Sequence, residues 1–368
     1  MKIPQADYDV EKIWRTILDA DLPKLFEDLH VHQIKVFFYL TQNGDNWLSA
    51  FSDDTYSTEN YGDMTRLTAE YTTRGGAKDE AVFFGGFFEG ELLMMLTGAT
   101  ERGIEQTLDR TIRTSGELVS MPIVPRDFQR INELVLEKSE DMRITSFKSR
   151  RIPDLADADI RPEYDREIEY KGDDGRQTLE EFREYYGVVP VRVQYEHENI
   201  NFKMDTEGKF TLLEINQETV NLLFELVKEI FDNVMQIQEI TQEIRFEKEE
   251  VRSGDFSITV PRLSAGRVDF DKPFNLLMAE EFVQNASDSA GNFTFTDVTM
   301  EAGSLDFSAR VTDEERSAHF NVSANEDSMT IVPKHNCSFA SIVDFYLAVV
   351  QVVDEGAKIT PYGSVPAT

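Results

Sequence analysis

Residues 201–237, NFKMDTEGKFTLLEINQETVNLLFELVKEIFDNVMQI, decide the fold class of this chain. Apolar and polar residues alternate on both sides of the turn-forming segment Asp205–Gly208, which predicts two short half-buried strands. Asn216 stands where a helix N-cap is expected, and Glu218 lies near the positive end of the helix dipole. The apolar residues that follow recur every three or four positions and predict one face of a long helix: Leu223, Leu226, Val227, Ile230, Phe231 and Val234.

A similar order of strands and helix recurs at residues 318–353 and, more faintly, at residues 81–112. This recurrence predicts three tandem blocks, each a mostly antiparallel sheet covered by helices on one face, which is an α+β fold class. The expected boundaries are residues 1–120, 121–238 and 239–368.

Within this scheme, strands are also predicted at Trp47–Phe51 and at Ile240–Val251. A helix from Ser338 onward is predicted to close the third block.

Acidic side chains dominate the composition. The 368 residues include 69 acidic and 37 basic ones, for a formal net charge of -32, and the acids are spread along the whole chain. Abundant acid with sparse lysine resembles the proteins of extreme halophiles, whose acidic surfaces need salt to screen their self-repulsion. At about 1 M salt, screening acts within about 3 Å, so local patches matter more than net charge and acidity does not exclude a nucleic-acid partner.

The chain has one cysteine, Cys337, so it cannot form an intramolecular disulfide. Its first residues, MKIPQADYDVEKIW, lack the apolar segment of a signal peptide, and no apolar run reaches the length of a membrane span. We therefore expect a cytoplasmic protein without membrane association.

Catalytic and metal-binding patterns are weak in this sequence. His30 and His32 could share one strand face as metal ligands, but the sequence nearby offers no partner with ligand spacing, and a structural role is favoured. Cys337 precedes a predicted helix start, where a thiol could be reactive, although a half-buried structural cysteine is favoured. The pairs Gly75-Gly76 and Gly85-Gly86 match no phosphate-binding spacing and indicate tight bends. No catalytic residue, metal ligand or cofactor site is therefore assigned.

The most distinctive local feature is a basic cluster formed by Arg143, Lys148, Arg150 and Arg151. It predicts a contact for phosphate groups or for an acidic partner. Regular strand alternation would place Arg143 on the face opposite Lys148 and Arg150, so the cluster would not form one stripe. Internal salt bridges to the surplus carboxylates are the favoured alternative.

Each block, ordered as helix, antiparallel strands and helix, resembles half of the TATA-box-binding-protein fold. Three such blocks in one chain resemble a bacterial-type sliding clamp. These resemblances rest on element order and imply nucleic-acid transactions. The leading hypothesis is a non-enzymatic binding or assembly protein with a protein partner or self-association, and with nucleic acid as a further candidate partner. The alternative is an enzyme, such as a hydrolase, whose site is assembled from dispersed carboxylates.

Overall fold

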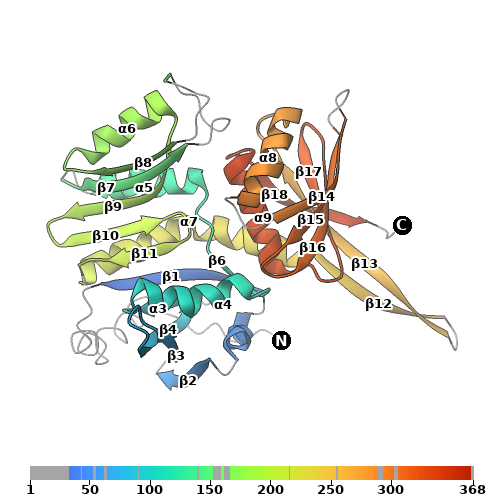
Figure 1. The fold of residues 1–368 in the computed structure, drawn as a ribbon, viewed down its shortest axis with the longest axis horizontal. Coiled ribbons are helices and arrows are strands. Elements are labelled where there is room, and N and C mark those ends of the chain that lie inside the picture. Colours follow the sequence, from blue (N-terminus) through green and yellow to red (C-terminus); the bar gives the residue numbers. More distant parts are fainter. Residues whose placement is uncertain are drawn as a thin grey trace.

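The computed structural model describes residues 33–42, 44–52, 55–61, 64–89, 91–138, 141–151, 159–160, 166–214, 216–253, 256–288, 293–301 and 306–365. In these residues, two antiparallel sheets stand side by side, connected by the long helix α7 (Gln217–Glu243) (Figure 1). The predicted α+β class is confirmed. Among the described helices, none is long and apolar enough to cross a membrane.

The first sheet contains eleven described strands in the order β2-β3-β4-β5-β1-β11-β10-β9-β7-β8, with β6 paired to β1. The strands are β1 (Ile34–Thr41), β2 (Tyr56–Tyr61), β3 (Met64–Thr72), β4 (Lys78–Phe88), β5 (Leu92–Thr97), β6 (Leu118–Ser120), β7 (Arg143–Arg151), β8 (Arg166–Lys171), β9 (Val189–His197), β10 (Ile200–Asp205) and β11 (Lys209–Leu212).

Strand β1 lies in the middle of this sheet and is buried along its whole length. It pairs with β5 on one side and with β11 on the other, so that Ile34 lies opposite Leu212. Strands expected in the first and second blocks therefore share one sheet. The division into three blocks that share a fold stays a prediction.

The hairpin and helix predicted in residues 201–237 are confirmed as β10, β11 and α7. The Asn216 side chain accepts a hydrogen bond from the Thr219 backbone N–H at 2.9 Å, as expected of an N-cap. The helix continues to Glu243, so the strand predicted from Ile240 is wrong in its first residues; β12 begins at Arg245.

Helices cover both faces of the first sheet. The 3₁₀ helix η1 (Gly44–Phe51) and the helices α3 (Glu101–Gln106) and α4 (Leu108–Thr114) pack on one face near β1, whereas α5 (Pro125–Lys138), α6 (Gly175–Tyr186) and α7 pack on the other. The strand predicted at Trp47–Phe51 is wrong, because this segment belongs to η1. The helical turn brings the Trp47 and Phe51 rings, four residues apart, to a distance of 5.7 Å between their centroids.

The second sheet has seven described strands in the order β12-β13-β17-β16-β15-β14, with β18 paired to β13. The strands are β12 (Arg245–Ser253), β13 (Phe256–Asp269), β14 (Phe293–Glu301), β15 (Asp306–Asp313), β16 (Ala318–Ala324), β17 (Ser328–Pro333) and β18 (Lys358–Val365), accompanied by the helices α8 (Leu276–Asp288) and α9 (Phe339–Val352).

Helix α9 links the two sheets. Its predicted cap is confirmed, since the Ser338 hydroxyl oxygen accepts a hydrogen bond from the Ser341 backbone N–H. The helix is buried almost all round and contacts α7, α8 and β6. One continuous apolar core therefore runs from the inner face of the first sheet, through α7 and α9, to the second sheet.

Candidate functional site

The predicted basic cluster lies on β7, near one edge of the first sheet. Regular alternation is interrupted there, because the β7–β9 register shifts between Ile144 and Ser146. The extra residue restores Arg143 to the face that carries Lys148 and Arg150, as their cross-strand partners show. The expectation that Arg143 would face the other way is therefore wrong, and the bulge is the physical reason.

Arg151 lies apart from the other three basic residues. It is fully buried on the inner face, where its Nη1 donates a hydrogen bond of 2.6 Å to the backbone carbonyl of Tyr186. Tyr186 is the last residue of α6, so this guanidinium sits at the negative end of the helix dipole. Arg151 therefore stabilises the C-terminal end of α6 and is not available to a partner in solvent.

Two members of the cluster, Arg143 and Lys148, are paired with carboxylates. Arg143 Nη2 lies 3.8 Å from Glu196 Oε1, and Lys148 Nζ lies 2.9 Å from Glu167 Oε1. These contacts are the internal salt bridges of the favoured alternative. They do not exclude a partner, because such exposed pairs contribute about 0–1 kcal/mol and exchange readily for another anion.

The sheet register adds basic side chains from three neighbouring strands. Lys148 lies opposite Arg192 of β9, and Gln194 of β9 lies opposite both Ser146 and Lys203 of β10. Ser146 also lies opposite Lys171 of β8. We call the resulting group the cationic face; it consists of Arg143, Lys148, Arg150, Lys171, Arg192 and Lys203.

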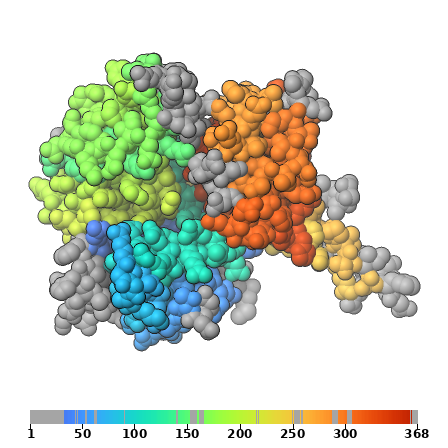
Figure 2. Space-filling model, in the orientation of Figure 1, coloured from blue at the N-terminus to red at the C-terminus, as the bar shows by residue number. Residues whose placement is uncertain are grey.

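The cationic face lies on the side of the sheet opposite α5, α6 and α7. In Figure 1, α5 and α7 lie behind the strands, and α3 and α4 lie in front near β1. Figure 2 shows the same side, where residues of β7, β9 and β10 reach the molecular surface in green to yellow. Basic residues outnumber acidic ones here although the chain as a whole is strongly acidic; the acidic ones on this face are Glu167, Glu169, Glu196 and Asp205.

Asp205 tunes the charge of this face. Its carboxyl group is buried, and burial together with Glu207 raises its pKa to about 6, against the opposing pull of Arg192. Asp205 Oδ1 accepts hydrogen bonds from the backbone N–H groups of Glu207 and Lys209, and Arg192 Nη2 lies 3.6 Å from Oδ2. Below about pH 6 this acid becomes neutral and the cationic face gains positive charge.

A cleft of about 610 Å³ separates the two sheets on another side of the molecule. Arg126, Gln129 and Arg183 of α5 and α6 line one wall, and Arg183 Nη2 donates a 2.9 Å hydrogen bond to Gln129 Oε1. Asp271 and Glu355 line the opposite wall. The cleft has the volume of a small-molecule site, and both basic and acidic side chains line it.

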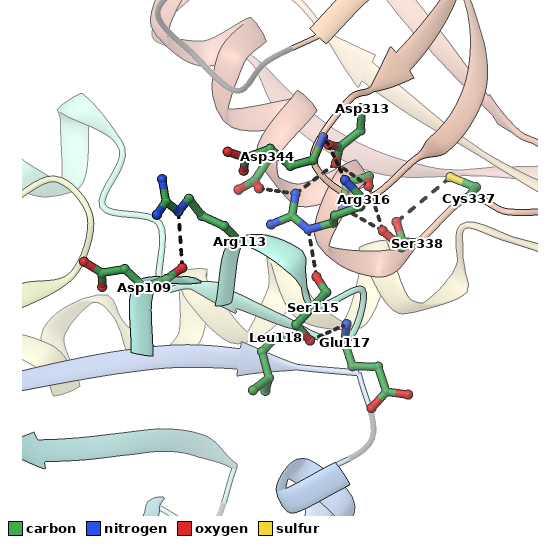
Figure 3. Close-up of polar contacts among 12 residues, drawn as sticks. Asp109, Arg113, Ser115, Glu117, Leu118, Asp313, Arg316, Cys337, Ser338 and Asp344 are labelled. Carbon is green, nitrogen blue, oxygen red and sulfur yellow. Dashed lines mark hydrogen bonds and ion pairs between the residues drawn. The ribbon is translucent and has the colours of Figure 1, made fainter. Parts of the chain in front are cut away.

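A buried ionic cluster fixes the two sheets to each other beside α9 (Figure 3). Arg316 Nη1 lies 2.9 Å from Asp313 Oδ2 and 2.7 Å from Asp344 Oδ2. Its Nε donates a hydrogen bond of 2.7 Å to the backbone carbonyl of Ser115, in the loop between α4 and β6. This cluster is a structural junction, since each of its charged groups already has a partner.

The remaining candidates have little chemical support. Cys337 lies beside this junction, where burial raises the pKa of its thiol to about 12, which opposes formation of a reactive thiolate. His30 and His32 lie outside the described residues. Within the described part of the chain, no group of three or more His, Cys, Asp or Glu side chains is placed to hold a metal ion.

Comparison with known proteins gives two matches. Residues 130–207 match the AF_0896_M family middle domain. An uncharacterized protein of Archaeoglobus fulgidus is 27% identical over 216 residues, which make up 55% of this chain and 56% of that protein. The similarity thus spans about half the length of this curated relative. The segment similar to the family middle domain includes β7, β8, β9 and β10, which carry the whole cationic face.

Sequence reasoning missed Lys171, Arg192 and Lys203. They are far from the β7 cluster in sequence and meet it only through strand pairing. Each lies at an alternating position in a short strand, which is a signal that gains meaning once the register is known.

Proposed function

We propose that this protein acts by binding rather than by catalysis, and that the cationic face holds a polyanionic partner of the nucleic-acid class. The observation that supports this proposal is the gathering of basic side chains from β8, β7, β9 and β10 on one face, in a chain of net charge -32. The overall composition does not account for this face, because the chain as a whole is acidic.

The spacing of the cationic face suits a phosphate backbone. Neighbouring strands lie about 4.8 Å apart, so four strands span about 14 Å. The phosphates of each strand of a duplex advance by about 3.4 Å per residue along the helix axis, so this span meets several of them. The carboxylate partners of Arg143 and Lys148 would be exchanged for phosphate oxygens at little cost, since both pairs are largely exposed.

Salt acts on this binding in two opposite ways. The net charge of the chain repels a polyanion at low ionic strength, and salt screens that repulsion. Salt also weakens each phosphate contact through the loss of counterion release. We therefore expect the affinity to pass through a maximum as salt rises, at an ionic strength well above that of ordinary nucleic-acid-binding proteins.

Fluorescence anisotropy with labelled single-stranded and double-stranded oligonucleotides tests the proposal across a KCl series. The variant Lys148→Glu plus Arg192→Glu should bind at least about ten-fold more weakly, and its salt slope should fall by about 1.4–1.8 for two lost phosphate contacts. Arg74→Glu plus Lys78→Glu is the matched control, because it makes the same change in charge in the exposed β3–β4 hairpin. Equal losses in both variants, or no binding by the unmodified protein at any salt, would refute the proposal.

The finer expectations from the sequence belong to the same proposal. They are a chain of three tandem blocks related to each other, a surface adapted to a halophile-like cytoplasm, and a role in assembly. The hairpin-and-helix order that recurs as β10-β11-α7 and β16-β17-α9 supports the first of these. A crystal structure in which the third block fails to superpose on the second would contradict it.

The alternative function is a hydrolase with a site built from dispersed carboxylates. The observation that favours it is the cleft of about 610 Å³ between the sheets, which is lined by Glu180 and Glu184 of α6 and by Asp271 and Glu355. A hydrolytic activity that disappears in Asp271→Asn plus Glu355→Gln, with folding intact, would favour this alternative. The same activity in the double variant would exclude the cleft as its source.

A further inference from the structure

Strands β12 and β13 form a long hairpin that projects from the second sheet. Their register runs through nine pairs, from Arg245 opposite Ser264 to Ser253 opposite Phe256. Among the described residues, β13 pairs on its other side with β18 from Leu263 onward. We call residues 245–262 the arm; Figures 1 and 2 show its described residues standing clear of the rest of the molecule.

The described side chains of the arm are mostly open to solvent. Its described side chains beyond Phe246 are exposed on both faces of the ribbon, including Glu247, Lys248, Thr259 and Val260. A two-stranded hairpin without a packed face is marginal in water, and β12 is an edge strand among the described strands of the second sheet, a position open to further strand pairing. These properties are typical of a segment that is completed by another chain.

The charge of the arm indicates that this other chain is a second copy of the protein. The arm holds equal numbers of basic and acidic residues, whereas the whole chain has a net charge of -32. Two copies of so acidic a protein repel each other least where this neutral segment meets its counterpart. A polyanion would require a basic excess, which the arm lacks. Its basic residues are Arg245, Lys248, Arg252 and Arg262, and its acidic residues are Glu247, Glu249, Glu250 and Asp255.

We propose that the arm is a self-association site, at which β12 pairs antiparallel with β12 of a second copy around a two-fold axis. A register centred on residue 249 sets Lys248 opposite Glu250 of the partner subunit, and the symmetry makes this contact twice. The register places the backbone of residue 249 on the axis. Pairing along this edge joins the two hairpins into a four-stranded sheet and satisfies the outer edge of β12.

Sedimentation equilibrium of the full chain at about 1 M KCl tests this pairing. The unmodified protein should be a dimer. Lys248→Glu should raise the dimer dissociation constant at least about ten-fold, since two attractive cross-strand pairs become repulsive. The charge swap Lys248→Glu plus Glu250→Lys should restore the dimer, and Lys78→Glu, on β4, should leave it unchanged.

Two results would overturn the proposal. One is a monomer at all accessible protein concentrations. The other is a dimer that survives Lys248→Glu unchanged, because the contact would then lie elsewhere. Circular dichroism of each variant confirms that the fold is retained, and the exposed position of Lys248 makes this the expected result.

Discussion

The substitution Arg316→Leu should destabilise the protein far more than its single charge suggests. Only 6% of the Arg316 side chain is exposed, and the Asp313 side chain is fully buried. Removal of the guanidinium leaves Asp313 with the Ser341 hydroxyl at 2.6 Å and with backbone donors, but it leaves Asp344 without its cation and the Ser115 carbonyl without its donor. Breaking a buried ion pair on one side costs about 3–5 kcal/mol, because the remaining charge stays desolvated.

Urea unfolding at about 2 M KCl, monitored by circular dichroism, measures this loss. It equals the change in the midpoint urea concentration multiplied by the slope of the free energy of unfolding against urea concentration. We expect a loss of about 3 kcal/mol in the free energy of unfolding. The control is Arg310→Leu, whose partner Asp297 lies 3.5 Å away with both side chains more than half exposed; it should cost about 0–1 kcal/mol.

The cause can be separated from simple loss of packing. Burial raises the pKa of Asp344, and Arg316 opposes that rise. In Arg316→Leu the pKa should rise further, so that acidification protonates Asp344 in the folded state and recovers part of the stability. Adding Asp344→Asn should recover about 1–2 kcal/mol at neutral pH. A loss below about 1 kcal/mol, or no recovery with Asp344→Asn, would refute the reasoning.

Three further predictions concern other parts of the chain. Burial raises the pKa of Asp205 to about 6, so the contribution of this group to the free energy of unfolding falls as pH rises from about 4 to about 6. Asp205→Asn should therefore be about 1–2 kcal/mol more stable than the unmodified protein at neutral pH. If the urea midpoints of the two proteins fail to converge on acidification, this prediction is contradicted. Gly175→Ala sets a Cβ 2.1 Å from the Ile144 carbonyl oxygen and should cost about 1–3 kcal/mol, whereas Gly75→Ala has Thr73 Oγ1 at 3.9 Å and should change stability by less than about 0.5 kcal/mol; equal midpoints would count against the packing of α6 on β7. Raising KCl from about 0.1 M to about 2 M should raise the thermal midpoint, since salt screens a net charge of -32, and an unchanged midpoint would argue against a halophilic surface.

Local patterns in the sequence predict local structure well in this protein. Asn216, the turn at Asp205–Gly208 and the three–four spacing after Leu223 were enough to place a hairpin, a cap and a helix. The end of that helix was missed because the residues from Ile240 onward were assigned to a strand. Gln238, in the last part of the helix, is buried, and its side-chain oxygen accepts a hydrogen bond from the Thr41 backbone N–H of the distant strand β1.

Long-range register was beyond the reach of the sequence. The pairing of β1 with β11 joins the first and the last described strands of this sheet in chain order, and the sequence near either strand gives no sign of the other. The candidate site shares this limit. Arg143 was assigned to the wrong face because one extra residue in β7 shifts the alternation. Arg192 and Lys203 joined the cationic face only through strand neighbours.

The central position of β1 has a consequence for how the chain folds. Because Ile34 pairs with Leu212, the first sheet cannot close until most of its residues have left the ribosome. Until then β1, which is apolar along most of its length, has one partner side open, and such an edge can pair with other nascent chains. Non-local strand pairing also slows folding, since a long loop must close before the contact forms. We therefore expect slow refolding limited by this closure, with aggregation as the competing reaction when salt is low or protein is concentrated.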